Sequence, residues 1–266
     1  MAGPQRRNYR VLPPIHANPG IAAGYRRQLE ALIDEMTNSL EYWLCARWKA
    51  DPPIMALDAT PADLMARTMR ELTKRWQTRF DDIARTVARR FAAGVTGATS
   101  NRIDRLLSEA GWRVNFTVSP GVRDVMAASV TENVGLIKSI AQQHLSKVEG
   151  IVMRNVQTGN DLASMTREIR KAGGVTRDRA AFIARDQTNK MTAVITRARQ
   201  EQAGIKRAVW MHSHAGETPR PEHLAFDGHI YNVSEGVDFH NGEGVVWPGT
   251  AINCRCTSRP VIEGFE

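Results

Sequence analysis

Long helical periodicity is the feature that most constrains this chain. Over residues 20–50, apolar side chains recur at steps of three and four, the spacing of one helical face. Asp51-Pro52-Pro53 ends this segment, because proline lacks a backbone donor and restricts the residue before it. The face that we expect to be buried consists of Tyr25, Leu29, Leu32, Ile33, Met36, Leu40, Trp43 and Leu44.

A second amphipathic helix is predicted over residues 61–93. Thr60 is a suitable N-cap, Pro61 suits the first turn, and Gly94 and Gly97 are expected to end the helix. We expect the helix to pair antiparallel with the first one. Its polar face is strongly basic and carries Arg67, Arg70, Lys74, Arg75, Arg79, Arg85, Arg89 and Arg90.

Further helices are predicted downstream. Ser100 is expected to cap a shorter helix that ends near Gly111, and the alternating residues 112–118 are compatible with one strand. A long helix follows Ser119-Pro120.

The helix that begins after Pro120 is expected to break at Gly159-Asn160. Two more helices are then expected, over residues 161–172 and 177–203. Gly173-Gly174 would separate them, and Gly204 would close the second as a glycine C-cap.

The residue pattern of the sequence changes after Gly204. Short alternating runs, separated by Gly, Pro, Asn and Asp, are typical of β-hairpins. The predicted fold class is therefore α+β: a mostly helical body with long amphipathic helices and a small β-containing C-terminal module. We divide the chain into a helical N-terminal region (1–118), a helical middle region (119–205) and the module (206–266).

Charge is distributed unevenly along the chain. The net charge of +8 arises because residues 206–266 carry five basic and eight acidic residues, while the other 205 residues carry 31 and 20. A basic helical body favours a polyanionic or acidic partner, although solvated helix faces explain the same pattern.

Several classes of protein are disfavoured. The apolar runs are shorter than the roughly 20 residues that span a bilayer, so no membrane partner is expected. The N-terminal residues lack the apolar core of a secretory signal and are interpreted as a loose arm. Three cysteines do not make a disulfide framework, which favours a reducing, cytosolic compartment.

The stretch from Arg220 to Cys256 combines histidines, acids and a tight Cys-x-Cys, and it permits three interpretations. A zinc site would use His223, Cys254 and Cys256, although one Cys-x-Cys supplies only two ligands. A metal-dependent hydrolase would add Asp227 as the orienter of a His223 general base. We assign no catalytic residue, because the sequence contains no nucleophile elbow and no phosphate-binding loop.

The third interpretation is structural, and the physical arguments favour it. Asp227-Gly228 suits a tight turn with positive φ at the glycine, and Arg220 and Arg255 would bond to carbonyls or carboxylates. The cysteines would pack as small apolar side chains. The expected set of cofactors is therefore empty, with zinc as the open alternative.

This stretch resembles the C-terminal signature of the phage Mu F-like minor head proteins, also called the head morphogenesis family. The resemblance extends over about residues 130–262, and Asp186-Gln187 replaces the usual Thr-Glu of the preceding helix, while Asn189 is retained. The signature falls on Trp210, Arg220, His223, Asp227, Gly228, Pro248, Gly249, Asn253, Cys254, Arg255 and Cys256.

The resemblance implies a non-enzymatic minor capsid protein of a tailed bacteriophage. Such proteins associate with the portal protein and with the inner capsid or scaffold, and act in head assembly and in genome packaging or delivery. The implied location is the virion, at the capsid interior or portal vertex, after assembly in the host cytoplasm.

An alternative is a DNA-binding or ejected virion protein that contacts double-stranded DNA without reading its sequence. The candidate phosphate contacts are Arg75, Arg79, Arg85 and Arg89.

Overall fold

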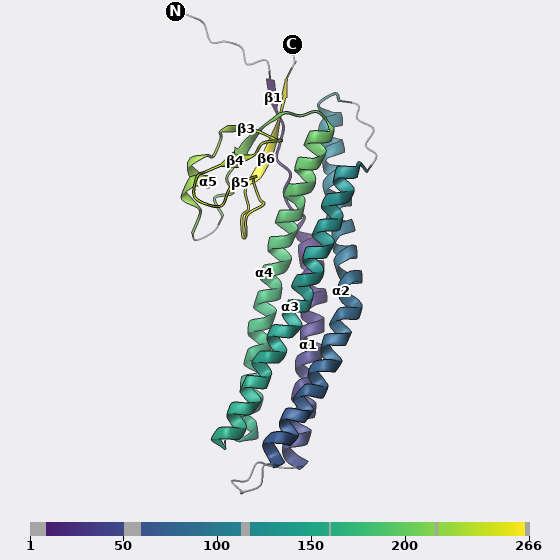
Figure 1. Ribbon diagram of the computed structural model, residues 1–266. Coiled ribbons are helices and arrows are strands. Elements are labelled where there is room, and N and C mark those ends of the chain that lie inside the picture. Colours follow the sequence, from purple (N-terminus) through teal and green to yellow (C-terminus); the bar gives the residue numbers. More distant parts are fainter. Residues whose placement is uncertain (1–8, 51–59, 113–117, 160, 216–217, 264–266) are drawn as a thin grey trace, which may run out of the picture. The chain divides into compact units, whose positions relative to one another are not determined.

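The computed structural model describes residues 9–50, 60–112, 118–159, 161–215 and 218–263. Four long helices dominate it (Figure 1): α1 (Pro19–Ala50), α2 (Thr60–Glu109), α3 (Pro120–Thr158) and α4 (Leu162–Gln202). A short helix, α5 (Pro221–Ala225), and the strands β2 (Arg207–Met211), β3 (Ile230–Asn232), β4 (Val237–Asp238), β5 (Val245–Val246) and β6 (Thr257–Glu263) follow. The α+β, mostly helical fold class is confirmed.

The chain forms two compact units. Unit 1 comprises residues 1–22, 91–129 and 186–266, and unit 2 comprises residues 23–90 and 130–185. Within the described residues, no helix combines the length and apolar character needed to cross a membrane.

Two predicted helix breaks are wrong. Helix α2 continues through Gly94 and Gly97 to Glu109, and α4 continues through Gly173-Gly174 to Gln202. A glycine inside a helix costs only about 1 kcal/mol relative to alanine, and a buried apolar face outweighs that cost. On α2 this face continues across the glycines through Phe91, Ala92, Val95, Ile103, Leu106 and Leu107.

Other predicted boundaries are confirmed or corrected. Helix α3 ends at Thr158, and Gly204 follows α4 with a φ of +72°, as expected. Ser100 is not a cap, because it is buried within α2 and its hydroxyl accepts a hydrogen bond from Arg199 Nε at 3.1 Å. The strand suggested for 112–118 lies almost entirely outside the described residues.

Unit 2 is a helical bundle with an apolar interior. Tyr25, Leu29, Ile33, Met36, Leu40 and Leu44 of α1 are buried, as predicted. Trp43 was wrongly placed on this face: it is 47% exposed, and Trp48 is buried instead. Leu40, Leu44 and Trp48 are spaced by four residues and share the buried face of α1, so Trp43 lies outside that face.

A chain of buried polar side chains links three helices of unit 2. The Thr176 hydroxyl donates to the Ala172 carbonyl, so it accepts from His144 Nδ1 at 2.9 Å. His144 Nε2 then accepts from the Thr37 hydroxyl at 3.2 Å. Burial, followed by nearby Lys147, lowers the pKa of His144 to about 4. The imidazole is therefore neutral and specifies which turns of α1, α3 and α4 face one another.

Unit 1 contains a four-stranded antiparallel sheet in the order β1-β6-β2-β3, and β4 pairs with β5. Its first strand, β1 (Tyr9–Val11), pairs with β6 (Figure 1), and Leu12 and Ile15 are buried. The prediction of a loose N-terminal arm is therefore wrong for these residues. The predicted C-terminal strands are confirmed as β2, β3 and β6.

The close approach of Gly173 to Thr37 generates a test of the unit 2 packing. A Cβ at Gly173 would lie 3.0 Å from Thr37 Cγ2, whereas a Cβ at Gly174 would meet nothing within 4 Å. We expect Gly174→Ala to raise the free energy of unfolding by about 0.5–1 kcal/mol. Gly173→Ala is expected to lower it, because Thr37 is held by its hydrogen bond to His144. Urea unfolding of both variants measures the difference, and equal stabilisation would contradict the close packing.

Candidate functional site

The residues of the predicted signature gather around one buried indole ring in unit 1. Trp210 of β2 has no exposed surface, and His223, Phe226, Tyr231 and Phe239 pack edge-on or tilted against it with ring centroids 5.0–6.0 Å away. Such aromatic contacts contribute beyond the burial of area alone. The small core of this region is completed by Ala208, Val233, Val246, Cys254 and Cys256.

Two signature positions shape the turn that returns the chain to β2. Gly228 has a φ of +79°, which confirms the predicted positive-φ turn, and its N–H donates to the Trp210 carbonyl at 2.8 Å. Asp227 Oδ1 accepts the His212 N–H at 2.8 Å, and Oδ2 lies 2.9 Å from His214 Nε2. The hydrogen bond from the His212 backbone is the main cause of a lowered Asp227 pKa.

The loop that leads into β6 is fixed by backbone contacts. Asn253 adopts a φ of +59°, and its N–H donates to Asp186 Oδ1 on α4. Arg220 Nη1 donates to the Ile252 carbonyl at 3.2 Å, which agrees with the predicted role of this arginine. Asp186, one of the two residues that replace the usual Thr-Glu, is buried and holds the signature loop.

His223, Cys254 and Cys256 converge, as the zinc interpretation requires. His223 Nδ1 lies 3.6 Å from Cys254 Sγ and 3.8 Å from Cys256 Sγ, and all three side chains are buried. Asp227 does not join this cluster among the described residues. The pairing of Asp227 with His223 that the hydrolase interpretation needs is therefore replaced by its contacts to His212 and His214.

The pKa values of the two thiols shift in opposite directions. The hydrogen bond with Cys256 and, to a lesser extent, the hydrogen bond with His223 lower the pKa of Cys254, although burial opposes this shift. The contact between the two thiols, together with burial, raises the pKa of the Cys256 thiol.

A cavity of about 70 Å³ lies beside this cluster. Its lining includes His212, His223, Cys254, Arg255 and Cys256. Arg255 is predicted to bond to carbonyls or carboxylates. Its side chain is half-buried and lines this cavity.

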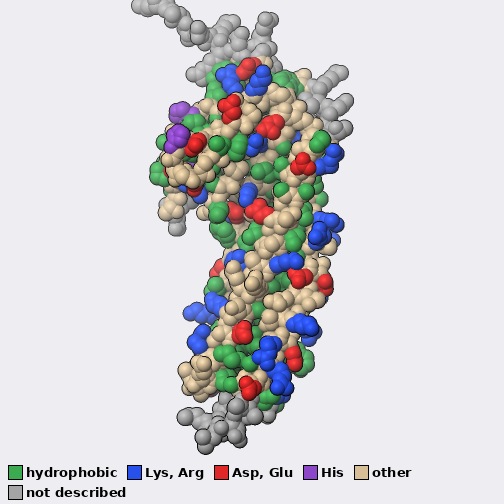
Figure 2. All heavy atoms as spheres, viewed as in Figure 1, with side chains coloured by type: hydrophobic (Ala, Val, Ile, Leu, Met, Phe, Trp, Pro, Cys, Tyr) green, Lys and Arg blue, Asp and Glu red, His purple; other side chains and the backbone are tan. Residues whose placement is uncertain are grey.

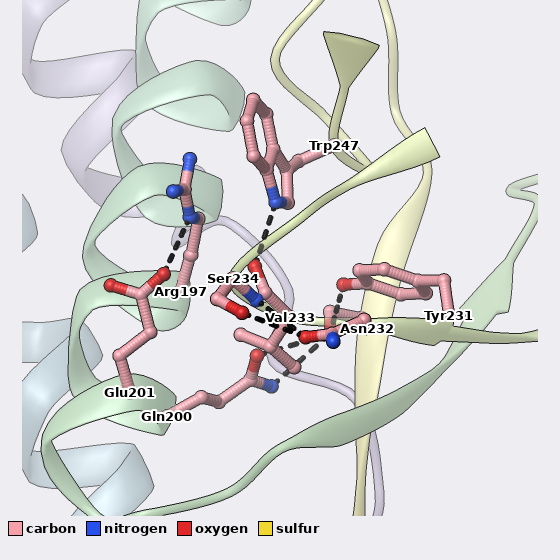
Figure 3. Close-up of polar contacts among 9 residues, drawn as sticks. Arg197, Gln200, Glu201, Tyr231, Asn232, Val233, Ser234 and Trp247 are labelled. Carbon is pink, nitrogen blue, oxygen red and sulfur yellow. Dashed lines mark hydrogen bonds and ion pairs between the residues drawn. The ribbon is translucent and has the colours of Figure 1, made fainter. Parts of the chain in front are cut away.

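Contacts from α4 hold the sheet of unit 1, and sequence reasoning missed them. Arg197 stacks over the Trp247 ring at 3.7 Å, and Trp247 Nε1 donates to the Val233 carbonyl at 2.8 Å (Figure 3). Gln200 bonds to Ser258 Oγ at 3.1 Å. The buried face of α4 that carries Gln200 also carries Thr192 and Thr196, so apolar periodicity in the sequence gave no signal for these contacts.

The candidate DNA contacts lie elsewhere, on α2 in unit 2. Arg75, Arg79, Arg85 and Arg89 are all exposed. Arg79 also pairs with Glu35 at 2.9 Å. Figure 2 shows basic side chains interspersed with acidic ones over the visible face of the helices.

The loop before Cys254 generates a test with a matched control. Gly249 and Gly242 have φ values of +84° and +87°, but only at Gly249 would a Cβ meet other atoms, Ala193 Cβ and the Cys256 carbonyl oxygen, both at 2.9 Å. We expect Gly242→Ala to cost about 1–2 kcal/mol of stability. Gly249→Ala should cost about 1–3 kcal/mol more, because it adds a clash. Urea unfolding followed by tryptophan fluorescence compares them, and equal losses would contradict this packing.

Comparisons with known proteins agree with this geometry. Residues 146–259 match the family described as "Phage Mu protein F like protein". The chain is 29% identical over 269 residues to a Haemophilus influenzae strain Rd protein described as "Uncharacterized protein". The match covers 98% of this chain and 58% of that protein, so the chain spans little more than half of its relative. No solved structure matches significantly. The resemblance seen in the sequence is thus confirmed for residues 146–259, which are similar to the Phage Mu protein F-like proteins.

Proposed function

We propose that this chain is a minor head protein of a tailed bacteriophage that attaches at the portal vertex and acts in head assembly and in genome packaging or delivery. The match over residues 146–259 carries the proposal, because it spans the Trp210 core and the His223–Cys254–Cys256 cluster. The portal protein and the inner capsid or scaffold are the proposed partners, and the virion is the proposed location. The role needs no catalytic residue.

Unit 2 supplies the proposed attachment surface. Tyr42 and Trp43 of α1 are 66% and 47% exposed, and their rings meet edge-on with centroids 5.2 Å apart. Tyrosine and tryptophan are enriched among the residues that dominate protein interfaces. A groove of about 770 Å³ adjoins them and is lined by both helices α1 and α4, including Glu41, Tyr42, Lys49 and Arg170. Val175 and Phe182 of α4 are also exposed, but among the described residues neither forms part of an aromatic pair on this surface, so the aromatic pair of α1 is the favoured anchor.

Replacing the aromatic pair tests the portal assignment. The full chain, co-expressed with the portal protein of the same phage genome, is expected to co-purify with it. We expect the double variant Tyr42→Ala/Trp43→Ala to reduce the recovered amount at least about tenfold, since loss of such anchors costs 2 kcal/mol or more. Val175→Ala, which changes a 49% exposed side chain on α4, is the control.

The outcomes separate the two parts of this proposal. Unchanged recovery of the double variant would show that another surface binds the portal. Absence of the unaltered chain from portal complexes and from assembled heads would contradict the minor head protein assignment itself.

A second candidate function is sequence-independent binding to the viral double-stranded DNA. The exposed Arg75, Arg85 and Arg89 on α2 favour it, because arginine in number binds phosphate without reading bases. Glu71 lies four residues before Arg75, and Asp82 lies between Arg75 and Arg85, so both reduce the net charge of this surface. We expect Arg79 to contribute less to DNA binding than the other three arginines, because its guanidinium already pairs with the Glu35 carboxylate.

Salt dependence tests DNA binding by this surface. The triple variant Arg75→Gln/Arg85→Gln/Arg89→Gln should bind random duplex DNA more weakly, with a log–log salt slope smaller by about 0.9 per lost phosphate contact. Arg79→Gln is the matched control and should change the slope little. Binding would be measured by fluorescence anisotropy at several salt concentrations. An unchanged slope in the triple variant would identify a protein as the partner of this face.

A further inference from the structure

We propose that His223, Cys254 and Cys256 bind one zinc ion in unit 1. The sequence alone favoured packing, because Cys-x-Cys supplies only two ligands and no histidine stands at a zinc-knuckle spacing. The fold supplies the third ligand from α5, 31 residues before Cys254. A histidine nitrogen with two sulfurs is a ligand set that zinc prefers over calcium or magnesium.

The distances within the cluster match a tetrahedral zinc centre. With zinc–sulfur bonds of about 2.3 Å and zinc–nitrogen bonds of about 2.05 Å, a sulfur and a nitrogen ligand lie about 3.6 Å apart. His223 Nδ1 lies 3.6 Å and 3.8 Å from the two sulfurs. A single N–H directs its proton at one acceptor, whereas a metal ion explains why one nitrogen lies almost equally far from both sulfurs.

The surroundings of His223 suit a ligand. The ring is held edge-on by Trp210 at 5.0 Å and is tilted against Phe239 at 5.3 Å, which fixes its orientation. Carboxylate oxygens of Glu222 and Glu243 lie within 4.8 Å of a ring nitrogen of His223. The ring nitrogen Nε2 is buried and has no hydrogen-bond partner among the described residues, so the carboxylate contact that often accompanies a metal-bound histidine is not formed.

A fourth ligand would come from the cavity of about 70 Å³ that these three residues line together with His212. His212 Nδ1 accepts the His214 N–H at 3.1 Å, so the proton of its neutral ring is on Nε2. His212 is therefore a donor and not a ligand. The cavity has room for a water molecule in the fourth position.

Glu222, His223 and Glu243 form a second possible metal cluster, and we favour it less. Its two carboxylates are partly or fully exposed and already have partners, Asn241 for Glu222 at 2.9 Å and Arg220 for Glu243 at 3.6 Å. The Cys254 and Cys256 sulfurs, by contrast, are buried beside His223. Exposed carboxylates with these partners favour zinc less than two buried sulfurs do.

Metal content of the full chain tests the proposal. The protein is purified without a histidine tag and dialysed. Its zinc content is then measured by inductively coupled plasma mass spectrometry. One zinc ion per chain is expected in the unaltered protein. Cys254→Ala, Cys256→Ala and His223→Ala should each lose it. Cys45→Ala, in unit 2, is the matched cysteine control and should retain it.

Two measurements on the unaltered chain avoid dependence on variants that fail to fold. Adding zinc chloride to the chelator-stripped protein should raise its melting temperature by several degrees, because binding energy becomes folding energy. Replacing zinc with Co²⁺ should produce the absorption bands of a tetrahedral cobalt–thiolate centre. A chain without zinc that shows neither response overturns the proposal and supports packing. Zinc retained after Cys254→Ala and Cys256→Ala would place the ion elsewhere and overturn it as well.

Discussion

The burial of Trp210 is the interaction on which the C-terminal part of unit 1 depends. A region with such short strands encloses little apolar area, so one large ring supplies a considerable share of its core. The ring touches α5, β3 and the segment after β4 through His223, Tyr231 and Phe239. The backbone carbonyl of Trp210 also accepts a hydrogen bond from the Gly228 N–H and so holds the turn at Gly228. Removing the indole would disconnect all of these segments at once.

The family-signature residues divide by the atoms they use. Gly228, Gly249 and Asn253 act through the backbone, since each adopts a positive φ. Arg220 acts through a hydrogen bond to a carbonyl. Only His223, Cys254 and Cys256 direct reactive atoms toward a common point. Most of the signature therefore builds the loop, and a small part of it forms the cluster that we propose as a zinc site.

In unit 2, buried hydrogen bonds between helices specify the packing. Apolar stripes on long helices permit several rotations and registers with similar burial. The buried hydrogen-bond chain from Thr37 through His144 to Thr176 removes this degeneracy, because a shifted register would leave polar groups without partners. Gly173 adds a steric condition, since only glycine admits Thr37 at this distance. A rigid bundle can then present Tyr42 and Trp43 in a fixed orientation.

The sequence by itself determined the elements that follow from local rules. Three- and four-residue spacing predicted the long helices, and alternation predicted β2, β3 and β6. It also predicted the positive φ of Gly228, because that conformation depends on one residue and its turn. Asn253 tolerates positive φ for a similar local reason, but nothing local indicated that it would be needed there.

Only the tertiary structure decided what depends on contacts distant in sequence. Gly94, Gly97, Gly173 and Gly174 look like breaks locally, but buried faces carry both helices through them. Residues 9–11 acquire a strand only because β6, some 250 residues later, offers an open edge. His223 meets Cys254 and Cys256 for the same reason, since Trp210 positions α5 against the β6 loop. Spacing along a chain fixes which face a residue occupies, whereas packing energy decides which faces meet.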